Sequence, residues 1–142
     1  MEKQTTIKNK ITLKGKGLHT GQNVEVNILP AQADSGIVFE RIDLENPVLI
    51  KADAEAVTET SRGTTIESKG AKVATIEHLM AALYASNIDN ALIEISGEEV
   101  PILDGSSKYW LEAIEKSGVE ELEKERKYFC LKEIVSYVDQ EN

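Results

Sequence analysis

The 142 residues of this chain suit one domain with a single hydrophobic core, and a hydrophobic content of 41% is ordinary for a water-soluble protein. The net charge of −9, from 25 acidic and 16 basic residues, argues against a nucleic-acid-binding protein, which would carry a basic face. No segment approaches the roughly 20 apolar residues that span a bilayer, and one cysteine cannot form an internal disulfide. We therefore expect a cytoplasmic protein with no nucleic-acid partner and no membrane span, in which Cys130 is a reduced thiol.

Alternating apolar and polar residues predict strands along much of the chain. The clearest patterns cover residues 6–14, 23–29, 37–41 and 91–95. Weaker patterns cover residues 48–57 and 64–73, and Ser68-Lys69-Gly70 would turn a hairpin within the second of these.

Two helices are predicted among these strands. The first runs from residue 76 to about residue 86 with Thr75 as N-cap, and the second runs from residue 107 to about residue 116, capped by Ser106 and ended by Gly118. The apolar stripe of the first comprises Ile76, Leu79, Met80 and Leu83. The inner side of the second comprises Trp110, Leu111 and Ile114. The expected fold class is α+β, a two-layer sandwich with a mostly antiparallel sheet of about five strands packed against two helices.

The carboxyl-terminal part differs in composition from the rest. Residues 120–127 comprise seven charged residues and one leucine, which is typical of an exposed linker. We therefore predict a domain over residues 1–119, a charged linker over residues 120–127, and a separate segment over residues 128–142 that is rich in aromatic and β-branched residues.

Glu77 and His78 stand side by side in the first predicted helix. A carboxylate beside an imidazole is costly to bury unless something holds it, and a metal ion would do so. At about 100° per residue, Glu77 lies on one flank of the apolar stripe and His78 on the far side of the helix. Because Ala81, Ala82 and Ala85 surround His78 there, we expect it to point into a second contact surface.

The number of available ligands limits the metal hypothesis. A catalytic zinc site needs about three protein ligands, and alanines occupy the positions at ligand spacing from His78, which excludes the two-histidine zinc helices. The only other histidine is His19. A single histidine on a helix is more often a core residue held by a hydrogen bond, and Glu77 could simply favour the helix dipole. Taken alone, the pair leaves both interpretations open.

Three motifs favour the metal site. They are Gly17-Leu18-His19-Thr20-Gly21 between two strand-like runs, Glu77-His78-Leu79 on the first helix, and Pro101-Ile102-Leu103-Asp104-Gly105-Ser106 before the second. In this order they closely resemble the amino-terminal half of the zinc-dependent UDP-3-O-acyl-N-acetylglucosamine deacetylases of lipid A (lipopolysaccharide) biosynthesis. The resemblance runs from about Thr6 to the carboxyl end, and the motifs together are far more specific than any one of them.

The resemblance implies roles for individual residues. Glu77 matches the family's general base, and His78 matches its first zinc ligand. Zinc lowers the pKa of bound water to about 7, so a nearby carboxylate can take its proton and deliver hydroxide to an amide carbonyl. Two loops match substrate-binding segments, one at the mouth of the active site and one beside the acyl chain of the substrate: Leu18 with His19, and Ser61 with Arg62.

The same resemblance implies that the site is shared with a second domain. The family's other zinc ligands, a histidine and an aspartate, and its general-acid histidine lie in that domain, whose start residues 128–142 resemble. The implied substrate is acylated UDP-N-acetylglucosamine, the implied cofactor is zinc with only a partial site here, and the implied partner is the second domain. We expect this chain alone to be inactive. The alternative is a non-catalytic interaction module that retains the half-fold.

Overall fold

The computed structural model describes residues 1–141 and is built around a five-stranded sheet in the order β2-β3-β9-β4-β5. The strands of this sheet are β2 (Ile11–Lys16), β3 (Asn23–Pro30), β4 (Ile37–Arg41), β5 (Val48–Lys51) and β9 (Ala91–Ile95). Neighbouring strands are antiparallel except β4 and β9, which run parallel. The predicted sheet of about five mostly antiparallel strands is therefore confirmed.

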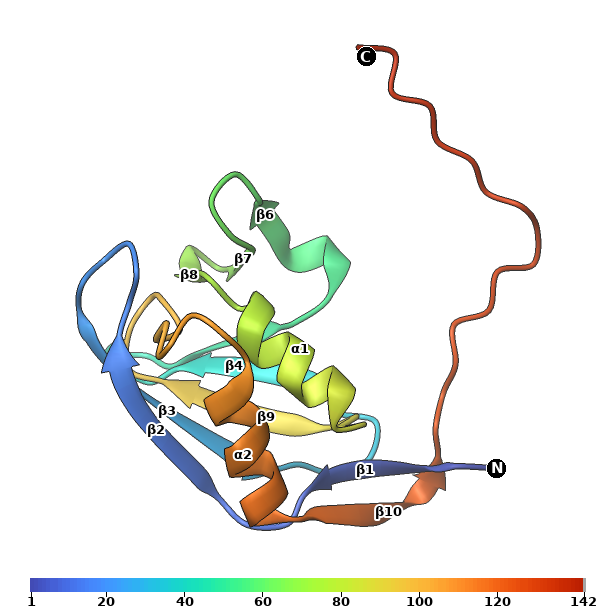
Figure 1. Ribbon diagram of the computed structural model, residues 1–142, viewed down its shortest axis with the longest axis horizontal. Helices are drawn as coiled ribbons and strands as arrows, with labels where there is room; N and C mark the ends of the chain where they lie inside the picture. Colours follow the sequence, from blue (N-terminus) through green and yellow to red (C-terminus); the bar gives the residue numbers. More distant parts are fainter. Residues whose placement is uncertain (142) are drawn as a thin grey trace.

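Two helices, α1 (Glu77–Ala85) and α2 (Lys108–Ser117), cover one face of this sheet and contact each other (Figure 1). The core between the two layers includes fully buried residues of both, among them Ile28, Phe39, Ile93, Leu79, Trp110 and Ile114. This arrangement confirms the predicted α+β two-layer sandwich. Within residues 1–141, neither helix is long and apolar enough to cross a membrane.

The second helix differs from its prediction in two details. Leu111 does not face inward, because 38% of it is exposed, whereas Trp110 and Ile114 are buried as expected. Ser107 rather than Ser106 occupies the N-cap position, although the Ser106 hydroxyl accepts a hydrogen bond from the backbone N–H of Lys108 at 3.1 Å. Both serines thus help to start α2.

The predicted strand over residues 6–14 is wrong as a single element. It is divided into β1 (Lys3–Ile7) and β2, which belong to different sheets. Between them the backbone turns to the end of α2: the Asn9 N–H donates to the Ser117 hydroxyl at 3.0 Å, and the Lys8 N–H donates to the Gly118 carbonyl at 2.9 Å. These bonds take the place of strand pairing, so the extended run is interrupted.

A small three-stranded sheet projects from the body and consists of β6 (Val57–Glu59), β7 (Thr65–Ser68) and β8 (Ala71–Val73). Its β7–β8 hairpin turns at Lys69 and Gly70, which both have positive φ, so the predicted hairpin is confirmed. The weaker pattern over residues 48–57 is divided between β5, a short 3-10 helix (Ala54–Ala56) and the start of β6. The small sheet matters because its β6–β7 loop carries Ser61 and Arg62.

The charged segment 120–127 is not an irregular linker over most of its length. Val119–Glu125 form β10, which pairs antiparallel with β1. Backbone hydrogen bonds to β1 hold this strand although most of its side chains are exposed, so composition alone did not predict it.

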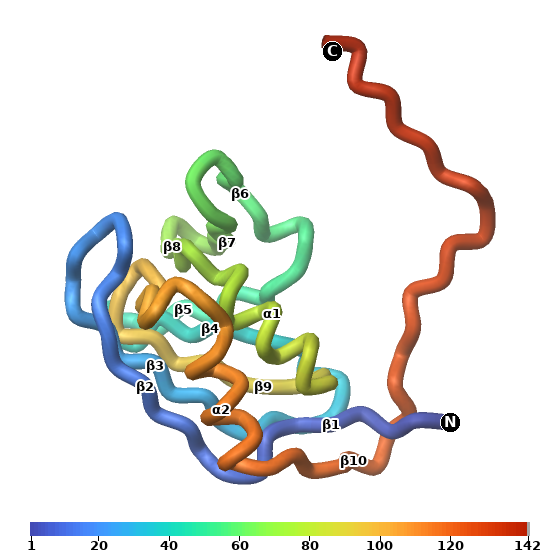
Figure 2. Tube along the Cα trace, viewed as in Figure 1, coloured from blue at the N-terminus to red at the C-terminus, as the bar shows by residue number. Residues whose placement is uncertain are grey.

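The division into two domains stays a prediction. Residues 128–141 form no helix or strand and run away from the body (Figure 2), and Asn142 lies outside the described residues.

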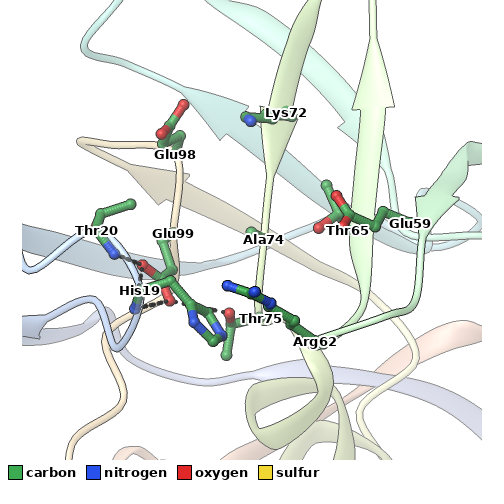
Figure 3. A pocket seen from close by; sticks show the side chains of 11 residues that line it. His19, Thr20, Glu59, Arg62, Thr65, Lys72, Ala74, Thr75, Glu98 and Glu99 are labelled. Carbon is green, nitrogen blue, oxygen red and sulfur yellow. Dashed lines mark hydrogen bonds between the residues drawn. The ribbon is translucent and has the colours of Figure 1, made fainter.

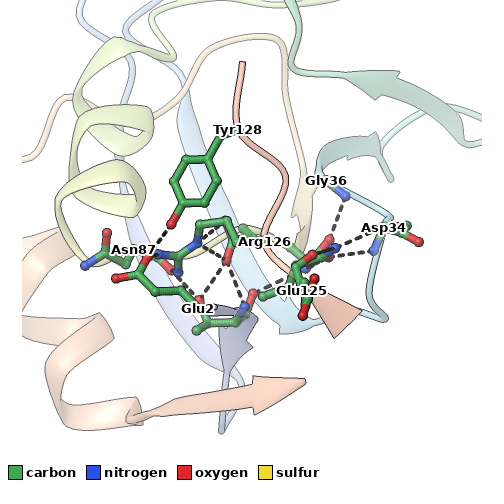
Figure 4. A network of polar contacts seen from close by, with 11 residues as sticks. Glu2, Asp34, Gly36, Asn87, Glu125, Arg126 and Tyr128 are labelled. Carbon is green, nitrogen blue, oxygen red and sulfur yellow. Dashed lines mark hydrogen bonds and ion pairs between the residues drawn. The ribbon is translucent and has the colours of Figure 1, made fainter. Parts of the chain in front are cut away.

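Arg126 follows β10 and is the centre of a polar network (Figure 4). Its Nε donates to both carboxylate oxygens of Asp89, at 3.0 and 3.1 Å, and its Nη1 donates to the Glu2 carboxylate at 2.8 Å. The Tyr128 hydroxyl also donates to Glu2, and the Tyr128 and Arg126 contacts lower the pKa of that carboxylate. The network fixes the point at which the chain leaves β10.

Arg126→Ala is expected to loosen the β1–β10 pair selectively. The substitution removes charge-assisted hydrogen bonds that tie the end of β10 to Glu2 and Asp89. Native-state hydrogen exchange should show the amides of β1 and β10 exchanging about tenfold faster, while those of the central sheet keep their rates. The control is Lys108→Ala, which removes only an exposed 4.0 Å ion pair on α2. Unchanged exchange in β10 would contradict the assignment.

Candidate active site

The first turn of α1 holds the predicted catalytic pair. Glu77 is its first residue, and the Glu77 Oε2 accepts a hydrogen bond from the backbone N–H of Thr64 at 3.0 Å. A Cβ at Gly63 would lie 3.0 Å from Oε1, so the β6–β7 loop approaches this carboxylate closely and glycine suits that position. The small sheet thereby orients the Glu77 side chain at the end of the helix.

His78 is half-buried and therefore stands outside the fully buried core. Its carbonyl accepts a hydrogen bond from the Ser107 hydroxyl at 2.7 Å, which ties the start of α2 to the first turn of α1. The predicted alanine surroundings hold only in part, because Ala81 and Ala85 are exposed whereas Ala82 is fully buried in the core.

A pocket of about 190 Å³ lies between the β2–β3 loop, the small sheet and the segment after β9 (Figure 3). His19 comes from the first of these and Arg62 from the second, so the structure brings together two predicted substrate-binding residues that are far apart in sequence. The other charged and hydroxyl-bearing residues of the lining are Thr20, Glu59, Thr65, Lys72, Thr75, Glu98 and Glu99.

The other two predicted substrate-binding residues lie outside this lining. Leu18 is 60% exposed on the β2–β3 loop, and the Ser61 hydroxyl donates to the Glu59 carboxylate at 2.7 Å. Each is thus adjacent in sequence to a lining residue without contributing to the lining itself.

Sequence reasoning missed Glu99, which is only 1% exposed. Its carboxylate accepts hydrogen bonds from the backbone N–H groups of His19, at 3.0 Å, and Thr20, at 2.8 Å. Burial by itself raises the pKa of Glu99, but the hydrogen bonds from His19, Thr20 and Thr75 together outweigh burial and hold the pKa below its usual value. A signal was present in the sequence: the apolar residues Ala91, Ile93 and Ile95 stand at every second position, and continuing this period beyond β9 places Glu99 on the same buried face.

Thr75 does not cap α1 as predicted. It has a positive φ of 57°, Ile76 occupies the N-cap position without a side-chain hydrogen bond, and the helix begins at Glu77. The Thr75 hydroxyl donates instead to the Glu99 carboxylate at 3.2 Å. The Thr75 hydroxyl therefore donates to a buried carboxylate instead of accepting from the backbone N–H groups of the helix.

The residues present fit one zinc ligand rather than a complete zinc site. Over residues 1–141, no three side chains of histidine, cysteine, aspartate or glutamate come together closely enough to hold a metal ion. His78 offers an imidazole beside the Glu77 carboxylate, which suits part of such a site.

Comparison with known proteins decides the family. The family model described as LpxC: UDP-3-O-acyl N-acetylglycosamine deacetylase matches residues 4–142. The chain belongs to the UDP-3-O-acyl N-acetylglycosamine deacetylase family. The resemblance drawn from the three sequence motifs is thereby confirmed.

Individual relatives within the deacetylase family agree with this assignment. The chain is 50% identical over 136 residues to a UDP-3-O-acyl-N-acetylglucosamine deacetylase of Geobacter sp. (strain M21). The matched segment covers 96% of this chain and 45% of the relative. A protein of the same name from Geotalea uraniireducens (strain Rf4) is 48% identical over 136 residues, covering 96% and 44%. A protein of Bacteroides thetaiotaomicron named bifunctional enzyme LpxC/FabZ is 46% identical over 140 residues, covering 99% and 30%. The chain thus spans less than half the length of each of these relatives.

Proposed function

We propose that this chain is the amino-terminal part of a cytoplasmic zinc-dependent deacetylase that hydrolyses the N-acetyl group of UDP-3-O-acyl-N-acetylglucosamine in lipid A biosynthesis. Relatives at 48% and 50% identity carry the name of that activity. The observation that carries the proposal is the placement of Glu77 and His78 in the first turn of α1, with the Glu77 carboxylate oriented by the Thr64 N–H at 3.0 Å.

Glu77 serves as general base in this proposal. A carboxylate has about four acceptor sites, and the Thr64 N–H occupies one of them on Oε2, so Oε1 has lone pairs left for the proton of the attacking water. His78 contributes one imidazole nitrogen as a metal ligand. Zinc, when bound, polarises a carbonyl and makes water more acidic. The remaining ligands and the general acid would come from a second domain.

The residues around the pocket would bind part of the substrate. A volume of about 190 Å³ is below the roughly 300–1,000 Å³ typical of a site for a whole small molecule, so His19 and Arg62 would hold only one portion. Leu18, with 60% of its surface exposed, would lie at the mouth of the site, and Ser61 with Arg62 in the other loop would lie beside the acyl chain of the substrate. The second domain would supply the rest of the binding surface.

The 142-residue chain alone is expected to show no deacetylase turnover and at most weak zinc binding. His78 cannot complete a catalytic tetrahedron without further ligands. The test is acetate release from the acylated UDP-sugar by the purified chain, with a no-enzyme control and metal analysis after dialysis against zinc. Turnover above the control would contradict the shared-site proposal.

A protein that joins this chain to the family's second domain is expected to release acetate when zinc is present. Its zinc content should approach one equivalent and fall with a chelator, and activity should fall with it. If that protein is folded and binds zinc but releases no acetate, the deacetylase assignment fails, and the interaction module becomes the better interpretation.

A further inference from the structure

Glu99 is a buried carboxylate whose charge is compensated by backbone groups. None of the ion pairs within residues 1–141 involves it, so the N–H groups of His19 and Thr20 and the Thr75 hydroxyl supply the compensation. Successive backbone N–H groups that converge on one anion form a nest, which binds negative charge through its dipoles. A buried carboxylate without these partners would be strongly destabilising.

The β2–β3 loop is closed around this carboxylate. The Gly17 N–H donates to the Gln22 carbonyl, and the Gly21 N–H donates to the Gly17 carbonyl, both at 3.0 Å. A Cβ at Gly17 would lie 2.3 Å from the Glu99 Oε2, which is closer than any real contact of this kind. The same Cβ would lie 2.4 Å from the Thr20 Oγ1, so a larger residue at position 17 would require the loop or these side chains to shift.

The other side of Glu99 is attached to the segment that leads into α1. The Thr75 hydroxyl donates to Glu99, and Thr75 stands two residues before Glu77. On either side of Glu99 the backbone also pairs with Ala74, through Ala74 N–H to the Glu98 carbonyl at 2.8 Å and Val100 N–H to the Ala74 carbonyl at 3.0 Å. One carboxylate thus connects the loop that bears His19 with the start of the helix that bears Glu77 and His78.

We propose that Glu99 is a positioning residue that fixes the His19 loop relative to the start of α1, which bears Glu77 and His78, and so sets the shape of the pocket that His19, Thr20 and Thr75 help to line. Its effect on turnover rests on the proposed deacetylase function, whereas its effect on the loop does not. Glu99 acts through His19 and Thr75 and does not itself touch the reacting atoms.

Glu99→Gln in the 142-residue chain tests the effect on the loop. Glutamine has nearly the same shape, but only its oxygen can accept, so the two carboxylate oxygens that receive the N–H groups of His19 and Thr20 are replaced by one neutral acceptor and one donor. We expect at least one of the two amides, the one that faces the new NH2 group, to exchange with solvent at least about tenfold faster, measured by NMR, and Glu99→Asp to recover part of the protection. The matched control is Glu98→Gln, because the Glu98 side chain lines the same pocket without bonding the loop.

Unchanged exchange at His19 and Thr20 in Glu99→Gln would overturn the proposal. Should that variant fail to fold, Gly17→Ala tests the same contact from the loop side, because its Cβ would lie 2.3 Å from the Glu99 Oε2 and 2.4 Å from the Thr20 Oγ1, so the loop and the carboxylate could not keep their present contact. Faster exchange confined to residues 17–22 would support the proposal, and exchange equal to that of the unchanged chain would overturn it.

Steady-state kinetics test the consequence for the site in the protein that includes the second domain. If Glu99 positions a substrate-binding loop, Glu99→Gln should raise KM by about tenfold and change kcat much less. A merely structural role would instead reduce the active fraction, which lowers kcat and leaves KM unchanged. If the unchanged protein has no deacetylase activity, the proposed function fails, and the exchange measurement still decides the role of Glu99.

Discussion

Glu77→Gln in the protein that joins this chain to the second domain is expected to lower kcat by about 10²–10⁴-fold while its zinc content stays near that of the unchanged protein. Glutamine keeps an oxygen that can accept from the Thr64 N–H, so the β6–β7 loop keeps its place against α1. The amide cannot take a proton from water. The loss therefore isolates the role of Glu77 as a base from its contact with the loop.

Substitution of the proposed zinc ligand should have a different effect from substitution of the proposed base. His78→Ala is expected to lower zinc content and activity together, because an imidazole that binds the metal is removed. Glu67→Gln, an exposed glutamate on β7 in the same small sheet, is the control and should leave both quantities unchanged. Metal analysis beside steady-state kinetics separates these results. A Glu77→Gln enzyme with near-normal kcat would show that Glu77 only stabilises the helix end and the loop.

The fold was predictable where side-chain periodicity determines the structure. The apolar stripes of α1 and α2 and the alternation in β3, β4 and β9 arise from burial against one core, and burial is what periodicity records. The β7–β8 hairpin was predictable because Gly70 readily takes the positive φ that its turn needs.

The errors arise where backbone contacts between distant segments decide the structure. The run over residues 6–14 is interrupted because Asn9 bonds Ser117, more than a hundred positions away in the sequence, and β10 is a strand because it pairs antiparallel with β1. Neither partner is visible in the local pattern. β-Strand propensity depends on such context more than helix propensity does.

The candidate site shows the same division. Glu77 and His78 drew attention because they are adjacent, and the family resemblance predicted the roles of these two residues and of His19 and Arg62. Glu99 was missed although period-two burial runs through it, since an acidic side chain is rarely assigned to a buried face. Thr75 was misassigned as a cap because its true partner, Glu99, is 24 residues away.

Trp110→Ala is expected to destabilise the chain by about 3–5 kcal/mol, the usual loss when a fully buried aromatic residue is truncated. Trp110 has no exposed surface and is among the largest side chains of the core between α2 and the sheet.

Trp110→Phe should destabilise the chain far less than Trp110→Ala. The indole Nε1 is buried without a hydrogen-bond partner among the described residues, so phenylalanine removes an unsatisfied donor while it keeps an aromatic ring in the core. The loss of volume and the relief of this donor partly offset each other, and we expect a net change of about 1 kcal/mol or less.

Urea unfolding followed by far-ultraviolet circular dichroism measures these free energies, since Trp110 is the only tryptophan and its fluorescence is lost in both variants. Leu111→Ala is the matched control on the same helix: with 38% of its surface exposed, it should cost much less than Trp110→Ala. The unchanged chain should unfold in one cooperative transition, because the two layers share a single core. If Trp110→Phe proved as damaging as Trp110→Ala, the indole N–H would have to contribute stability, and the packing of α2 described here would be wrong at that position.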